Sequence, residues 1–176
     1  MEIFIEKLKL EDASELFKFE CQNRKFFEKQ VPSRGNDYYR YEHFQMILKE
    51  LLNEQSQGTC NFHLIRNDEN TIVGRINLVD IDPNKQLGHI GYRVGENYTG
   101  LRVATKALEL LLLETEHYSV NEIHAKTTPN NLGSQIVLER NSFQRCFIEE
   151  NAIELNGKKL DFIHYVWKKG LFHVVP

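Results

Sequence analysis

The chain has 176 residues, of which 41% are hydrophobic and 27% charged, and its formal net charge is −3. This length suits one well-buried domain and is short for two, so we expect a single domain over residues 1–176. The mild negative charge provides no broad basic face, which argues against a nucleic-acid partner. Its longest apolar run covers residues 110–113, far below the roughly 20 residues of a membrane span, which argues against a membrane protein.

The three cysteines, Cys21, Cys60 and Cys146, are widely spaced and odd in number. They show neither a disulfide framework nor the spacing of metal ligands. We therefore expect reduced, mostly buried thiols and a cytoplasmic protein. The first ten residues alternate charged and apolar side chains, which is not typical of a signal peptide.

The first half of the chain predicts a strand, two helices and three further strands. Asp12, followed three residues later by Glu15, is typical of a capping box at the first helix start. Because the last three strands are joined by short turns, they must be antiparallel neighbours. In chain order, the predicted elements are a strand at 3–10, a helix at 12–27, a loop at 32–36, a helix at 37–55, and strands at 59–66, 71–81 and 87–94.

The second half predicts alternating helices and strands. A helix joins the strands at 87–94 and 121–128, which favours parallel pairing between them. The sequence thus predicts an α/β (α+β) fold: a mixed, mostly antiparallel sheet of about seven strands with one parallel step, flanked by about four helices. In chain order, the predicted elements are a helix to about residue 117, a strand at 121–128, a helix at 131–140, and strands at 143–150 and 153–169 that form a hairpin around Asn156-Gly157.

The most informative segment covers residues 91–113, where an extended run passes through a polar turn into a long apolar helix. This order places the unpaired N–H groups of a helix start, and the positive end of its dipole, at the end of a strand. Such a site binds phosphate. Gly95 and Gly100 have the glycine spacing of a Walker-type loop, but Leu101 and Arg102 replace its Lys-Ser/Thr pair. A G-x-G-x-x-G fingerprint is also absent from the sequence.

The order of elements, together with three motifs, resembles the GCN5-related N-acetyltransferase (GNAT) family over nearly the whole chain. NYTGLR at 97–102 occupies the place of the family's [Q/R]-x-x-G-x-[G/A] loop and is followed by VATKAL. The segment TTPNNLGSQIVLERNSF and the closing NGK and DFIHY are similar to the ribosomal-protein, RimJ/RimL-type branch. That branch acetylates the N-terminal α-amines of proteins.

Three residues depart from the family pattern. Asn97 replaces Gln or Arg, Arg102 replaces Gly or Ala, and Ser142 replaces the glycine before Phe143. Since a helix entry needs no positive φ, we expect an ordinary backbone conformation at Arg102. Its guanidinium would either reach a phosphate or point to solvent. The change at Ser142 is interpreted as one of packing.

The resemblance implies acetyl-CoA as the donor, a primary amine as the acceptor, and no metal, because helix-start N–H groups meet the pyrophosphate charge. The pantetheine arm would pair with the strand at 92–94, where the family's fourth and fifth strands splay apart, and an N–H near Val94 would face the thioester oxygen. Asn131 would bond the pantetheine amide, or cap the short helix, or both. The implied cofactor-binding residues are Tyr92, Val94, Gly100, Leu101, Arg102, Val103, Ala104, Thr105 and Asn131.

The resemblance also suggests catalytic groups. Leu138 stands where many GNAT enzymes carry a tyrosine acid, so Ser134 would hydrogen-bond the departing thiolate instead. An α-amine, with a pKa near 8, asks less of a general base than a lysine near 10.4. This favours a protein or peptide N-terminus as the acceptor. The candidates for the base, acting through a water, are Glu149 and Glu150, and then His89 and His124.

Aromatic side chains flank the loop at 32–36, and in the family this helix–loop–helix covers the acceptor site. We expect Phe27, Pro32 and Arg34 to contact the acceptor, although packing between two helices also explains the aromatics. A small-molecule amine acetyltransferase and a non-catalytic CoA sensor stay open as alternatives. The apolar tail at 171–175 fits either a homodimer contact or a last strand.

Overall fold

The structure, a computed structural model, describes residues 1–155 and 157–170. Within these residues, helices and strands follow one another in the predicted order, with short 3-10 turns between some of them. The elements are β1 (Ile3–Lys7), α1 (Ala13–Phe27), α2 (Tyr41–Ser56), β2 (Asn61–Asn67), β3 (Ile72–Asp82), β4 (Leu87–Val94), α3 (Val103–Leu113), β5 (Glu122–Thr127), α4 (Leu132–Arg140), β6 (Gln144–Leu155) and β7 (Lys158–Lys168).

The main changes concern four predicted boundaries. The strand expected at 3–10 ends at Lys7 and is followed by a 3-10 turn at Leu10–Asp12, and the helix expected to reach about residue 117 ends at Leu113 before another 3-10 turn. The helix expected at 37–55 is interrupted because Arg40 is extended, so that a 3-10 turn at Asp37–Tyr39 precedes α2. The strand expected to end near residue 150 instead continues to Leu155. Asn151 takes a left-handed φ of 51° there, and the pairing of β6 with β7 shifts register nearby. Asn156, expected in the hairpin turn, and the apolar tail at 171–175 lie outside the described residues.

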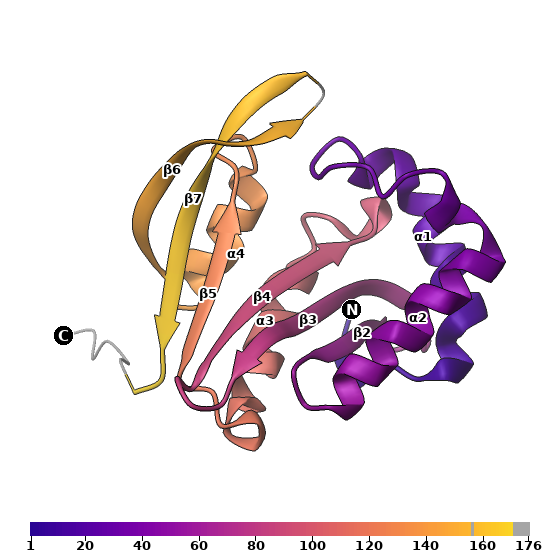
Figure 1. Cartoon of the computed structure of the whole chain (residues 1–176), viewed down its shortest axis with the longest axis horizontal. Helices are drawn as coiled ribbons and strands as arrows, with labels where there is room; N and C mark the ends of the chain where they lie inside the picture. Colours follow the sequence, from indigo (N-terminus) through magenta and orange to yellow (C-terminus); the bar gives the residue numbers. More distant parts are fainter. Residues whose placement is uncertain (156, 171–176) are drawn as a thin grey trace.

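The strands form one sheet in the order β1-β2-β3-β4-β5-β7-β6. Of the strand pairs described, β4–β5 is parallel and the others are antiparallel, which confirms the predicted fold class. The parallel pairing is short: Leu87–His89 pair with residues 122–124, whereas β4 stays paired with β3 as far as Val94. Figure 1 shows β4 and β5 diverging beyond this point. The splay that the family resemblance implied is therefore present.

Two apolar cores cover the two faces of the sheet. One contains residues of α3 and α4, and the other contains residues of α1 and α2. All of β2 is buried because it lies between both layers. Members of the first core include Ile76, Leu78, Ala107, Leu108, Leu111, Ile123, Leu138 and Tyr165, and members of the second include Leu16, Phe19, Phe44, Leu48, Phe62 and Leu64.

The predicted capping box at the start of α1 is wrong. Asp12 occupies the N-cap position, but its side chain accepts no capping bond and instead pairs with Arg66 at 2.9 Å. Glu15 also binds Arg66, at 2.9 Å, and accepts a bond from the backbone N–H of Ile72. The physical reason is that the guanidinium of Arg66 is buried, so two carboxylates are engaged in pairing it.

The expectation of mostly buried thiols is wrong for two of the three cysteines. Cys60 is buried, whereas Cys21 and Cys146 are exposed. Cys21 lies on the outer face of α1, and Cys146 lies on β6, the outermost strand, whose first residues are exposed. In the part of the chain that the structure describes, no helix is long and apolar enough to cross a membrane.

A buried ionic cluster ties α1 to the sheet. Glu20 is fully buried, and its Oε1 accepts hydrogen bonds from Arg75 at 3.1 Å and Arg93 at 2.6 Å. Its Oε2 has no hydrogen-bond partner among the described residues. The guanidinium of Arg93 lies 4.8 Å from the centroid of the Phe27 ring. The cluster thus carries two guanidinium charges against one carboxylate.

Replacing Glu20 should strongly destabilise the protein, because Glu20→Ala leaves two largely buried guanidinium groups without their carboxylate. We expect the free energy of unfolding to fall by about 3–5 kcal/mol. Urea unfolding followed by circular dichroism measures this change. Glu11→Ala, at an exposed acid in the turn before α1, is the matched control and should change little. Equal effects of the two variants would contradict this role for Glu20.

Candidate active site

A cleft of about 370 Å³ lies between the start of α3, the exposed end of β4 and one face of α4. Its charged lining residues, Arg102 and Arg140, are both cationic, so the cleft suits an anionic ligand. The residues that line it are Tyr92, Val94, Tyr98, Thr99, Gly100, Arg102, Val103, Ala104, Thr105, Asn131, Gly133, Ser134, Ile136, Val137 and Arg140.

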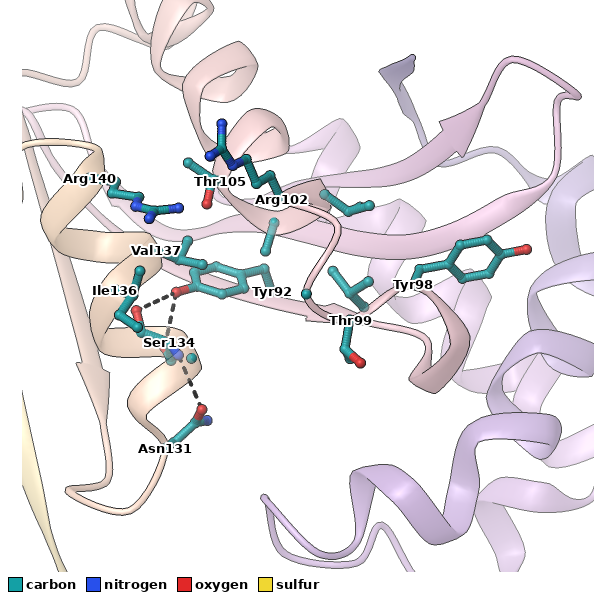
Figure 2. A pocket seen from close by; sticks show the side chains of 15 residues that line it. Tyr92, Tyr98, Thr99, Arg102, Thr105, Asn131, Ser134, Ile136, Val137 and Arg140 are labelled. Carbon is teal, nitrogen blue, oxygen red and sulfur yellow. Dashed lines mark hydrogen bonds between the residues drawn. The ribbon is translucent and has the colours of Figure 1, made fainter. Parts of the chain in front are cut away.

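One end of the cleft is the start of α3. The first hydrogen bond that closes this helix runs from the N–H of Lys106 to the carbonyl of Arg102 at 3.0 Å. The N–H groups at 103–105 have no acceptor among the described residues and lie at the positive end of the helix dipole. Figure 2 shows Arg102, Thr105 and Arg140 at this end of the cleft. The arrangement provides backbone and guanidinium donors for phosphate.

The expectation of an ordinary backbone at Arg102 is wrong. Gly100 and Arg102 both have positive φ, of 75° and 61°. The chain must turn sharply between the 3-10 turn that ends at Tyr98 and the start of α3, and Arg102 is the left-handed N-cap. Ser142 likewise has φ of 64°, so its change from the family's glycine concerns backbone conformation rather than packing. At both Arg102 and Ser142, therefore, a glycine would adopt the observed positive φ without strain.

Three hydrogen-bonded residues, Tyr92, Ser134 and Asn131, form the other end of the cleft (Figure 2). The Tyr92 hydroxyl lies 2.9 Å from Ser134 Oγ, where either oxygen can donate, and 3.2 Å from the carbonyl oxygen of Ser134. Asn131 Oδ1 accepts from the Ser134 N–H at 3.1 Å, so Asn131 caps α4. The cap occupies Oδ1 with this bond and fixes the first turn of α4, which carries Ser134.

The phenol of Tyr92 is a group that the sequence did not assign, since only its backbone was expected to act. Burial raises the pKa of Tyr92 to about 12, while the hydrogen bond to Ser134 opposes the shift. The phenol is therefore protonated at neutral pH and can donate to Ser134. Leu138, where the family's usual tyrosine would stand, is buried in the core.

A second hollow, of about 440 Å³, adjoins the cleft and shares Thr99, Asn131 and Gly133 with it. It reaches the end of α1 and the loop before α4. Its lining residues are Phe26, Lys29, Gln30, Thr99, Thr128, Asn130, Asn131, Leu132, Gly133 and Leu155. The two hollows adjoin beside Ser134, and together they extend from the start of α3 to the end of α1; we call this pair of hollows the path.

Eight of the nine expected cofactor residues line the cleft. Leu101 does not: its side chain is exposed and lines a shallow hollow beside Met1 and Ile3. Sequence reasoning missed six lining residues, of which two lie before α3 and four lie on α4. The four on α4 recur every three or four positions, so a search at helical spacing around Ser134 would have found them. The missed residues are Tyr98, Thr99, Gly133, Ile136, Val137 and Arg140.

The candidate bases lie outside both hollows. Glu149 and Glu150 are exposed on β6, and the Glu149 carboxylate lies 2.9 Å from Nε2 of His164 on β7. His89 and His124 face each other where β4 and β5 still pair, away from the splay, with ring centroids 5.5 Å apart. Neither histidine reaches the cleft. Among the described residues, no group of three or more His, Cys, Asp or Glu is placed to hold a metal.

The expected acceptor residues are separated. Phe27 is buried among aromatic side chains, and its neighbour Phe26 lines the second hollow instead. Pro32 and Arg34 are exposed on the loop and line neither hollow, while the Arg34 guanidinium lies 4.7 Å from the Tyr38 ring centroid. Phe26 and Phe27 are consecutive, and the rotation of about 100° between neighbouring helix positions turns one side chain to the hollow and the other to the core.

The left-handed backbone at Arg102 predicts how substitutions there change the free energy of unfolding. Arg102→Gly should raise the free energy of unfolding by about 0.5–1 kcal/mol, because glycine adopts positive φ without steric cost but loses more entropy on folding. Arg102→Ala keeps the strain and should give no such gain. Urea unfolding of both variants measures the difference. A gain with alanine equal to that with glycine would show that the side chain, not the backbone, causes it.

This chain is similar to known acetyltransferases. It is 27% identical over 158 residues to "Probable N-acetyltransferase YjcK" of Bacillus subtilis (strain 168), a match that covers 88% of this chain and 87% of that protein. Ribosomal-protein-S5-alanine acetyltransferase from Vibrio fischeri matches with a TM-score of 0.90 at 19% identity, over 97% of this chain and 94% of that one. RimL, a ribosomal L7/L12 α-N-protein acetyltransferase in complex with coenzyme A, matches with a TM-score of 0.86 at 18% identity, over 94% and 93%. At these identities the structural matches establish the fold.

The family is settled by sequence. The family model described as an acetyltransferase (GNAT) domain matches residues 2–144, which is most of the chain. The start of α3, the splayed strands β4 and β5 and all the residues that line the cleft lie within the matched range. The chain therefore belongs to the GNAT family of N-acetyltransferases, which use acetyl-CoA as the acetyl donor.

Proposed function

We propose that residues 1–176 act as one cytoplasmic acetyltransferase domain that transfers the acetyl group of acetyl-CoA to the α-amine of a protein or peptide N-terminus. The observation that carries this proposal is the pair of adjoining hollows. The first lies at the start of α3 and contains Ser134, and the second shares three residues with it and reaches the end of α1. The first hollow would hold the cofactor, and the second would hold the polypeptide end.

Acetyl-CoA would enter with its pyrophosphate on the N–H groups at 100–105, beside Arg102 and Arg140. The pantetheine arm would follow the exposed end of β4, where divergence from β5 leaves an open strand edge. The side-chain nitrogen of Asn131 is available to it, since Oδ1 is used in the cap. An N–H near Val94 would stabilise the oxyanion formed at the thioester carbon.

The reaction needs a neutral amine and a stabilised thiolate. The amine nitrogen attacks the thioester carbonyl carbon, the C–S bond breaks, and the proton of the amine passes through a water to a base. We assign the base to Glu149 or Glu150 of β6; because both lie outside the two hollows, the water must carry the proton to them. The Ser134 hydroxyl donates to the thiolate, and Tyr92, which bonds Ser134, positions it.

The α-amine is favoured as acceptor for two reasons. Its pKa, near 8, leaves part of it neutral at pH 7, whereas a lysine near 10.4 is almost fully charged. The branch motifs and the names of two structural neighbours, which acetylate ribosomal proteins, also support it. A small-molecule amine is the alternative acceptor.

Titration with acetyl-CoA, together with thiol release on a panel of peptides and small amines, tests the function. We expect binding and turnover on peptide N-termini. Turnover on small amines alone would change the acceptor class, and tight binding without turnover on any amine would indicate a sensor. Absence of binding would refute the proposal.

Loss of the Ser134 hydroxyl should affect turnover rather than binding. We expect Ser134→Ala to lower kcat about 10- to 100-fold, because a hydrogen bond to the thiolate is lost. Tyr92→Phe, which removes only the positioning bond, should lower kcat about 3- to 10-fold. The affinity for acetyl-CoA, measured by titration, should stay nearly unchanged. Tyr41→Phe, on α2 and away from the cleft, is the control, and an unchanged kcat for Ser134→Ala would remove it from the mechanism.

The base can be identified by pH dependence. Glu149→Gln or Glu150→Gln, whichever removes the base, should lower kcat at least about tenfold at pH 7. The loss should shrink above pH 9, where the α-amine is already neutral. Initial rates from pH 6 to 10 measure this, with Glu154→Gln on the same strand as control. If both variants keep the wild-type rate at pH 7, neither glutamate is the base.

A further inference from the structure

The second hollow has one charged lining residue, Lys29, near the end of α1. Among the residues that the structure describes, no carboxylate lines either hollow. Lys29 is exposed and has no ion pair within the described part of the chain. The cationic character of the cleft therefore continues past Ser134, to the side away from Arg102 and Arg140.

The surrounding segment has an excess of positive charge that its own acids do not neutralise. Residues 24–40 contain five Lys or Arg and two acids, although the whole chain has a net charge of −3. Glu28 is held by Arg24 at 2.9 Å, and Asp37 lies 3.6 Å from Arg40. Lys25, Lys29 and Arg34 are thus left without an ion pair in the described residues, although Arg34 stacks on an aromatic ring.

A second source of positive charge lies behind the aromatic wall of the hollow. Phe26 lines the hollow, and its ring centroid is 6.0 Å from that of Phe27. The guanidinium of Arg93 in turn lies over the ring of Phe27. Arg93 and Arg75 share the single carboxylate of Glu20. This cluster has an excess of one positive charge, and because it is largely buried its field is screened less than that of a surface charge.

The phosphates of acetyl-CoA do not account for these cations. They are met at the start of α3, at the opposite end of the path, by Arg102 and Arg140. The anion that Lys29 would pair with must therefore arrive with the acceptor. Along an extended peptide, each residue adds about 3.3–3.6 Å, so side chains two or three residues from the amine can reach the hollow while the amine lies near Ser134.

We propose that the preferred acceptor is a polypeptide whose second or third residue is acidic, and that Lys29 pairs with this carboxylate. The inference rests on the proposed function and specifies its substrate class. The same positive field disfavours the ammonium form of the acceptor amine, which aids the reaction because only the neutral amine attacks. Lys29 is thus a specificity residue, separate from the groups that act on the thioester.

Three peptides test the proposal. They begin with serine and differ only at positions two and three, which are both aspartate, both asparagine or both lysine. With the full chain and acetyl-CoA we expect kcat/KM for the aspartate peptide to exceed that for the asparagine peptide about 3- to 10-fold, and the lysine peptide to be poorest. Lys29→Glu should reverse this order. Lys25→Glu makes the same charge change on an exposed turn of α1 that lines neither hollow, and it should keep the wild-type order.

The outcomes distinguish a failure of this inference from a failure of the proposed function on which it rests. Equal kcat/KM on all three peptides, or an equal change in both lysine variants, overturns the acidic preference and leaves N-terminal acetylation intact. No turnover on any peptide, with turnover on a small amine, overturns the acceptor class itself. Free aspartate is included as a fourth acceptor, and a rate above that of the aspartate peptide would assign the carboxylate to a small molecule rather than a polypeptide.

Discussion

The structure depends on one interruption of hydrogen bonding, the divergence of β4 from β5 after three parallel pairs. Backbone N–H and C=O groups seek partners, and a strand that loses its neighbour must find another acceptor or donor. Here the open edge of β4 faces the cleft between α3 and α4, where an extended amide-bearing ligand can replace the missing strand. The antiparallel pairing of β4 with β3 continues to Val94 and holds this part of β4 in the sheet.

The turn after β4 combines strain with a rigid support. Left-handed φ at a residue other than glycine costs roughly 1–2 kcal/mol, and Arg102 bears this cost at the N-cap of α3. The buried residues of α3, among them Leu108 and Leu111, fix the helix against the sheet and hold the turn in place. The side chain of Asn141, which donates to the carbonyl of Thr105 at 3.2 Å, ties α3 to α4. Arg102 thereby adds a positive charge at the α3 end of the cleft, while its backbone keeps the left-handed turn that a glycine would adopt.

Charge is distributed along the cleft in a way that the net charge of the chain conceals. Cations line both ends, and Ser134 lies between them in a stretch whose polar groups are neutral hydroxyls and amides. A charged acid near the thioester would oppose the thiolate that leaves, whereas a protonated hydroxyl pair does not. Tyr92 on β4 presents its hydroxyl to Ser134, whereas the position on α4 where the family usually has a tyrosine is filled by the buried Leu138.

The sequence by itself determined the order of the elements, the parallel step and the turn that enters α3, because hydrophobic period, turn residues and helix starts are local properties. It did not determine the backbone at Arg102, the partners of Asp12 and Glu15, or the burial of the cysteines. Those depend on residues distant in the chain, such as Arg66, which binds both acids only once β2 lies against α1. The pairing of Tyr92 with Ser134, and the choice of Phe26 and Lys29 rather than Phe27 and Arg34 beside the hollow, were likewise decided by tertiary structure. Contacts between separate elements and the rotation of a helix about its axis are fixed only when the core packs.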